Sequence, residues 1–142
     1  MMREITIRNK PSELQRVANF VEEIGGELGI DGELLMNLNL ALEEMVSNII
    51  HYAHPQQSDD CIALKAESDG AEIIFTLADQ GIEFDPTQKG HLDTDANPAE
   101  RELGGMGIFI VKNIMNKVTY QRTAGQNVVT LVKRLTGEKV KI

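Results

Sequence analysis

The feature that most constrains the fold is a pair of short apolar runs joined by a tight turn near the middle of the chain. Residues 61–66 and 72–78 are rich in apolar and β-branched side chains, and residues 68–70, Ser-Asp-Gly, form a strong turn sequence. Alternate residues of the second run share one face of a strand, namely Ile73, Phe75 and Leu77. The sequence therefore predicts a β-hairpin whose apolar face the rest of the chain must cover.

Helical spacing of apolar residues precedes this hairpin. A short strand is expected at residues 4–8, followed by a helix that opens at residues 11–13 and ends near Leu28, with glycines at 25, 26 and 29 ending or fraying its last turns. A second, longer helix is expected from Asp31, a suitable N-cap, to about His54, where Pro55 stops it. Two consecutive helices are thus predicted to lie between the first strand and the hairpin.

The C-terminal half begins with a long stretch that has no periodic pattern. Residues 80–103 are mostly polar or helix-breaking, and so long an irregular loop in a compact domain is usually a lid, a binding loop or a disordered segment. A third helix is expected over 106–116, followed by a hairpin of strands 117–123 and 127–135. This order predicts a single domain over residues 1–142, an α+β two-layer sandwich with a mixed, mostly antiparallel sheet and helices on one face.

Charge and composition exclude several function classes. The net charge of −8, without a basic stripe, argues against nucleic-acid binding, so a phosphate ligand must be held by backbone N–H groups, a metal or one or two cations. The lone Cys61 cannot form an intramolecular disulfide, and neither a signal peptide nor a membrane-spanning run is present. We therefore expect a soluble, cytoplasmic protein with no membrane partner, and a Mg-nucleotide rather than a polyanion as ligand.

The first candidate site lies on the second helix. Glu44 and Asn48 are one turn apart, about 40° on the helical wheel, whereas Glu43 is about 140° from Asn48. An Asn oxygen is a suitable Mg²⁺ ligand, and a carboxylate one turn earlier can accept a proton from an attacking hydroxyl or water. The same spacing also fits a solvated glutamate and an asparagine that hydrogen-bonds locally.

The second candidate site follows the hairpin. Asp79 ends the apolar face of the strand, where its carboxylate needs a donor, and Gly81 allows close approach to the backbone. The amino group of adenine satisfies both conditions. A simple Asp-x-Gly turn is the alternative.

The third candidate site is a glycine-rich helix start. Gly104, Gly105 and Gly107 directly precede the helical run at 108–111, and exposed N–H groups at a helix N-terminus can hold phosphate. These glycines also fit a plain turn, because the run is neither a Walker A loop nor a dinucleotide-binding fingerprint. The order of the three sites nevertheless fits one nucleotide pocket.

These segments carry a family resemblance. Residues 39–53 resemble the N box of the Bergerat-fold ATPases, and residues 79–86 and 103–107 resemble their two glycine boxes. The particular form, with Phe-Asp-Pro at 84–86 and Gly-Gly-Met-Gly at 104–107, is similar to the anti-sigma-factor serine/threonine kinases. The resemblance extends over nearly the whole chain.

The resemblance implies a role for each site residue. Glu44 would be the general base, Asn48 the Mg²⁺ ligand and Asp79 the partner of the adenine amino group. Gly81 would admit the ring, residues 87–103 would form the ATP lid, and the phosphates would be lined by Gly104, Gly105 and Gly107. The implied activity is transfer of phosphate from ATP to a serine or threonine of an anti-sigma-factor antagonist by a kinase homodimer that also holds a sigma factor.

Some positions depart from the family pattern, and two rival functions stay open. Glu83 stands where many relatives have glycine, and the lid residue Arg101 has no certain counterpart. Residues 125–128, Gly-Gln-Asn-Val, stand where a Gly-Thr pair often sits, so Thr130 is given no role. One rival is a nucleotide-binding partner-switch module without kinase activity. The other is the catalytic domain of a histidine-kinase-type system, whose phospho-accepting histidine would have to come from elsewhere.

Overall fold

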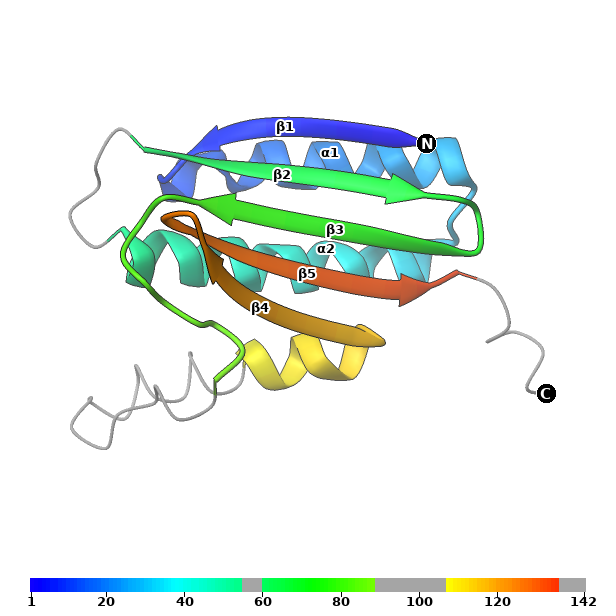
Figure 1. Cartoon of the computed structure of the whole chain (residues 1–142). Coiled ribbons are helices and arrows are strands. Elements are labelled where there is room, and N and C mark those ends of the chain that lie inside the picture. Colours follow the sequence, from blue (N-terminus) through cyan, green and yellow to red (C-terminus); the bar gives the residue numbers. More distant parts are fainter. Residues whose placement is uncertain (55–59, 89–106, 136–142) are drawn as a thin grey trace.

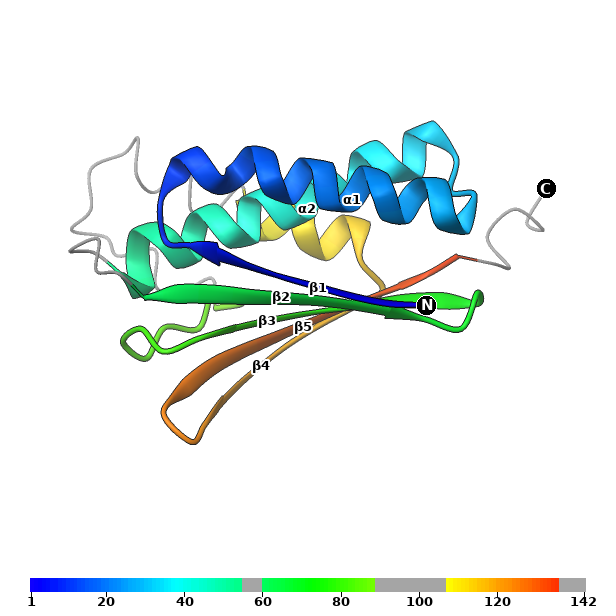
Figure 2. The same cartoon turned by 90° about the horizontal axis from the view of Figure 1, so that it is seen from above.

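The sheet and the helices form two layers. The protein's structure, a computed structural model, describes residues 1–54, 60–88 and 107–135. Within these residues one sheet spans the molecule, and α1, α2 and a helix of residues 107–114 pack against the same face of it (Figures 1 and 2). None of the described helices covers the opposite face of the sheet (Figure 2).

The sheet contains five strands in the order β1-β2-β3-β5-β4. Their bounds are β1 (Met2–Arg8), β2 (Cys61–Ser68), β3 (Glu72–Asp79), β4 (Lys117–Thr123) and β5 (Gln126–Arg134). All four pairings are antiparallel. The predicted α+β sandwich with helices on one face is therefore confirmed, and among the described strands the sheet is antiparallel throughout rather than mixed.

The first helix continues past two glycines. A 3-10 turn, η1 (Pro11–Glu13), leads into α1 (Leu14–Leu28), and Gly29 ends it in the left-handed conformation with φ 66°. The expectation that Gly25 and Gly26 fray the last turns is wrong, because both lie inside the helix. A Cβ on Gly25 would lie 2.5 Å from Leu35 Cδ1, so the glycine lets the two helices pack closely.

The second helix changes its winding near its end. In α2 (Gly32–Asn48) the predicted N-cap is confirmed, since Asp31 Oδ1 accepts the Leu34 N–H at 2.9 Å. The chain then continues as a π-helical turn, η2 (Ile49–Ala53), capped by His54. A π turn adds a residue to the winding, and such insertions are frequent at functional sites.

Both predicted hairpins are present. In the β2–β3 turn Asp69 Oδ1 accepts the N–H groups of Ala71 and Glu72, which lower the pKa of the Asp69 carboxyl, and Gly70 has φ 95°. In the β4–β5 turn Ala124 and Gly125 have φ 52° and 77°, a pattern that matches the right-handed twist of a hairpin. The core between sheet and helices includes Phe75, Leu77, Met45 and Leu131.

Among residues 1–54, 60–88 and 107–135, no helix is long and apolar enough to cross a membrane.

Candidate nucleotide site

The Glu44–Asn48 pair predicted on α2 points toward Gly107, the first described residue of the third helix. A Cβ built on Gly107 would lie 2.5 Å from Glu44 Oε2 and 3.8 Å from Asn48 Nδ2. Glu44 is half-buried, whereas Glu43 is exposed and lies elsewhere on the helix. The structure thus brings Glu44, Asn48 and Gly107 together, and the missing side chain of Gly107 leaves the space that the Glu44 carboxylate fills.

Partial burial changes the acidity of Glu44. Desolvation raises the pKa of its carboxyl above the ordinary glutamate value, and the negative charge of Glu43 raises it further. A carboxylate with a raised pKa is a better proton acceptor than an ordinary surface glutamate. This electrostatic setting suits a general base.

Asn48 offers a buried amide beside this carboxylate. Its side chain belongs to a residue that is 7% exposed, and Nδ2 has no hydrogen-bond partner among the described residues. In the same part of the chain no group of three or more His, Cys, Asp or Glu side chains is placed to hold a metal. Mg²⁺ commonly binds through one or two protein oxygens and substrate phosphates, so the amide oxygen of Asn48 fits that role.

Asp79 is a buried carboxylate with one occupied and one free oxygen. Oδ1 accepts from Gly81 N at 2.8 Å, Asn127 Nδ2 at 3.1 Å and His54 Nε2 at 3.1 Å. Oδ2 is buried and has no partner within residues 1–54, 60–88 and 107–135. A buried acceptor without a donor is unfavourable, so Oδ2 is suited to a ligand that donates an N–H.

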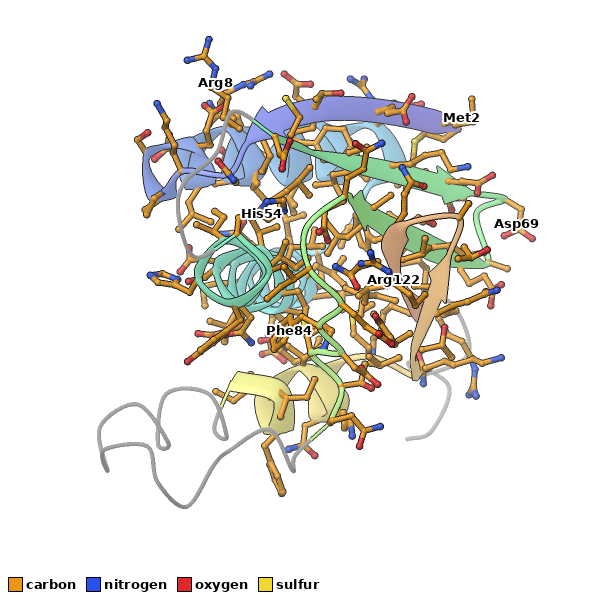
Figure 3. The ribbon with its side chains drawn as sticks, turned by 60° about the vertical axis from the view of Figure 1, so that its left-hand side comes forward. Met2, Arg8, His54, Asp69, Phe84 and Arg122 are labelled. Atoms are coloured by element: carbon orange, nitrogen blue, oxygen red, sulfur yellow. The ribbon has the colours of Figure 1, made fainter. Side chains whose placement is uncertain are left out.

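The π turn places His54 between two carboxylates. The imidazole is 1% exposed, with Nε2 toward Asp79 and Nδ1 3.6 Å from Asp60 Oδ2. Figure 3 shows His54 and Arg122 on either side of the segment that follows β3. Because Asn48 is the N-cap of η2 and His54 is its C-cap, this one turn links the Glu44–Asn48–Gly107 group to Asp79.

The backbone at the end of η2 leaves no room for a side chain at position 81. A Cβ at Gly81 would overlap the carbonyl oxygen of Ala53, which accepts the Ile82 N–H at 3.0 Å. The resemblance assigns Gly81 to the approach of an adenine ring. The structure adds a separate reason for glycine, which is contact between the segment after β3 and the end of η2.

Apolar side chains are exposed on η2 and on the segment after β3. The rings of Tyr52 and Phe84 lie 5.3 Å apart, and Tyr52 is 38% exposed. Ile82 is 60% exposed. Exposed apolar groups on the two segments that adjoin His54 and Asp79 are suited to the surface of a flat heterocycle.

Part of the predicted site lies outside the described residues. These are Gly104, Gly105 and most of the predicted lid at 87–103, Arg101 included. The first residue of that lid is described: Thr87 donates its N–H to Asp85 Oδ1 at 2.9 Å, and its carbonyl accepts from Lys112 Nζ at 3.0 Å.

Sequence reasoning missed Asn127 as a site residue. Asn127 lies directly opposite Asp79 in the β3–β5 pairing and is 2% exposed. It has the same parity as the core residues Val129 and Leu131, and a polar residue at a core position is the signal that identifies it. Thr130 has the opposite parity, so it lies on the other face of the sheet.

Comparison with known proteins identifies the fold and the family. The family model described as "Histidine kinase-like ATPase domain" matches residues 7–133. The chain belongs to this family. Its curated relatives include the serine/threonine-protein kinase BtrW of Bordetella bronchiseptica, 28% identical over 74% of this chain and 74% of the relative. They also include the serine-protein kinase RsbW of Staphylococcus epidermidis, 30% identical over 72% of this chain and 67% of the relative.

A solved structure shares the architecture. The RsbU and RsbW domains of Rv1364c from Mycobacterium tuberculosis superpose with a TM-score of 0.68 at 18% identity over 95% of this chain. This chain spans 32% of that longer protein. The resemblance to anti-sigma-factor serine kinases inferred from the three sequence motifs is thereby confirmed at the level of the family.

Proposed function

We propose that this histidine kinase-like ATPase domain is a protein serine/threonine kinase that uses MgATP. The observation that carries the proposal is the half-buried Glu44, held beside Asn48 and Gly107, with a raised pKa. A protein that only binds nucleotide needs no base at this place. The curated relatives named as serine kinases support the same reaction class.

The reaction is an in-line phosphoryl transfer. The hydroxyl oxygen of a partner serine or threonine forms a bond to the γ-phosphorus, the bond from that phosphorus to the β–γ bridging oxygen breaks, and ADP leaves. Glu44 takes the hydroxyl proton, and backbone N–H groups around Gly107 would hold the phosphates. Bound Mg²⁺, with Asn48 as its protein ligand, would neutralise phosphate charge.

Adenine recognition is assigned to the other end of η2. Asp79 Oδ2 is the acceptor for the 6-amino group, and Oδ1 stays engaged by protein donors. Guanine presents a carbonyl oxygen at that place, which a carboxylate oxygen repels. The site therefore favours ATP over GTP.

The partners follow from the family resemblance. The expected substrate is an anti-sigma-factor antagonist, and the expected second partner is a sigma factor bound by a kinase homodimer. Two other functions share the same pocket: a partner-switch module that binds nucleotide without transferring phosphate, and the catalytic domain of a histidine-kinase-type system. A kinase that phosphorylates a serine or threonine needs a base to accept the hydroxyl proton, and neither rival function explains Glu44 as directly.

Calorimetry and a transfer assay test the proposal. ATP should bind more tightly with Mg²⁺ than without it, and Asn48→Ala should remove most of that difference. Labelled phosphate should then pass to a hydroxyl of an antagonist protein encoded in the same genome, giving an acid-stable product. Acid-labile phosphate on histidine would favour the histidine-kinase function, and binding with no transfer to any antagonist would favour the partner-switch module. Absence of adenine-nucleotide binding would overturn the proposal.

A further inference from the structure

Asn127 connects three parts of the adenine end of the site. It is the first buried residue of β5 and is the direct cross-strand neighbour of Asp79. Its side chain reaches Asp79 and the segment of residues 81–84, which leads away from β3. The residue is therefore placed between the carboxylate and the backbone that borders it.

The two ends of the Asn127 amide face opposite kinds of group. Nδ2 donates to Asp79 Oδ1 at 3.1 Å and to the Ile82 carbonyl at 2.8 Å. Oδ1 accepts from three donors, which are Phe84 N at 3.1 Å, the Tyr120 hydroxyl at 2.6 Å and Arg122 Nη1 at 3.2 Å. Rotating the amide by 180° would set Nδ2 against three donors and Oδ1 against two acceptors. The hydrogen-bond network thus fixes one orientation of the amide.

This orientation determines which oxygen of Asp79 is available. Asn127 supplies one of the three donors that occupy Oδ1, and the other two come from His54 and Gly81. Because these donors all converge on one oxygen, the carboxylate is held with Oδ2 free among the described residues. Arg122 also donates to the Gly81 carbonyl at 2.8 Å, which ties the same segment to β4.

We propose that Asn127 is a positioning residue for base selection: its amide holds the Asp79 carboxylate so that Oδ2 meets the 6-amino group of adenine. This inference rests on the proposed function, because it requires an adenine nucleotide at Asp79. Asn127 would act on the base only through Asp79, because its own partners are protein groups. A serine or threonine at this position has one hydroxyl and cannot supply two donors and an acceptor at once.

The test compares two nucleotides that differ only in the group that Asp79 recognises. Calorimetry gives the affinity of the whole chain for ATP and for purine riboside triphosphate, which lacks the 6-amino group. A hydrogen bond to a charged acceptor predicts that wild type prefers ATP by about tenfold or more. Asn127→Asp keeps the size of the side chain but sets a second carboxylate against Asp79, which is then expected to rotate. The preference for ATP should fall below about threefold.

Two further variants separate positioning from general structure. Asn127→Ser removes the amide without adding a charge and should also lose the preference. Val129 lies two residues along the same strand and is 1% exposed, so Val129→Ala should lower the Tm while keeping the preference for ATP. Only a positioning role predicts a change in the ratio of the two affinities rather than a parallel loss of both.

Each outcome decides the inference. Retention of the wild-type ratio in Asn127→Asp and Asn127→Ser overturns it and leaves the kinase proposal intact. The inference is also overturned if neither variant folds while Val129→Ala does, because Asn127 is then a structural residue. If wild type binds both nucleotides equally, the role of Asp79 in base selection fails, and the inference fails with it. Phosphoryl transfer is measured separately and can still support a kinase.

Discussion

The Glu44 carboxylate and the Cα of Gly107 share one small space between α2 and the helix of residues 107–114. A Cβ on Gly107 would lie 2.5 Å from Glu44 Oε2, closer than real Cβ contacts allow. The obstructing atom belongs to the end of a flexible side chain, so an alanine at 107 would displace the carboxylate rather than the backbone. Glycine at 107 is therefore linked to the position of the candidate base, in addition to its proposed role at the phosphates.

Gly107→Ala should lower the rate of phosphoryl transfer through Glu44. A displacement of about 1 Å at a catalytic group can reduce the rate about 10²-fold, and we expect a loss of that order. In a Glu44→Gln background the same alanine should have little further effect, below about threefold, because the group that it displaces no longer acts as a base. Single-turnover rates of the four proteins of this cycle give the measurement.

An additive result would contradict this interpretation. If the alanine lowers transfer about 10²-fold in both backgrounds, it acts on phosphate binding and not on Glu44. Dissociation constants for ATP, measured on the same four proteins, identify that case, because the alanine would then raise them in both backgrounds.

Local sequence patterns predicted the scaffold well. The hairpin at 61–78, the N-cap at Asp31 and the side of α2 that carries Glu44 all follow from periodicity and turn chemistry, which depend on neighbours in sequence. The family motifs likewise lie in continuous segments. These features could be predicted because each is encoded within one short, continuous segment of the chain.

The parts that were missed depend on contacts between distant segments. The π turn at Ile49–Ala53 replaces the last turn of a helix whose apolar pattern gave no sign of it. Asn127 meets Asp79 only because β5 pairs with β3 in one register, and its partners come from three other elements. Gly81 faces a carbonyl 28 positions earlier, at Ala53, which no local pattern indicates.

The raised pKa of Glu44 predicts the acid side of the pH–rate profile. Glu44 accepts a proton only when it is ionised, so transfer should fall as the pH drops through a pKa that lies above the ordinary value of 4.5. Burial is the main cause of this shift and Glu43 the second, so Glu43→Gln should move the acid limb to lower pH. Glu33→Gln removes an equal charge from the exposed first turn of α2 and should leave the limb in place. Equal shifts in both variants would show that the pH of the acid limb depends on the net charge of the protein and not on Glu43 in particular.

The same shift predicts that Glu44 lowers stability at neutral pH. Because the folded protein binds the Glu44 proton more tightly than the unfolded chain, the free energy of unfolding falls as the pH rises from 4.5 through the folded pKa. Glu44→Gln should therefore raise the Tm relative to wild type at pH 7, and the difference should shrink below pH 4.5. A lower Tm at pH 7 would mean that the carboxylate forms a stabilising contact when it is ionised.

Asp79→Asn should weaken binding of adenine nucleotides selectively. The substitution keeps the size of the side chain but replaces one carboxylate oxygen with an NH₂ group and removes the charge. Loss of one hydrogen bond to a charged acceptor lowers ATP affinity by about 1.5–3 kcal/mol, or roughly 10- to 150-fold. GTP, which wild type should bind weakly, is expected to change far less. A parallel loss for ATP and GTP would indicate that the variant disturbs the fold.

Gly81→Ala should destabilise the protein although its backbone needs no positive φ. The added Cβ would overlap the Ala53 carbonyl oxygen, a backbone atom at the end of η2 that cannot rotate away as a side chain can. Overpacking of this kind costs about 1–3 kcal/mol, to be measured as the free energy of unfolding in urea. Gly26→Ala is the matched control, since a Cβ there meets nothing within 4 Å inside α1, and it should raise stability by about 0.5–1 kcal/mol. If Gly81→Ala were as stable as wild type, the Ala53–Gly81 contact would relax freely. Gly81 would then be needed only for a ligand, and its alanine variant should lose ATP affinity while keeping the stability of wild type.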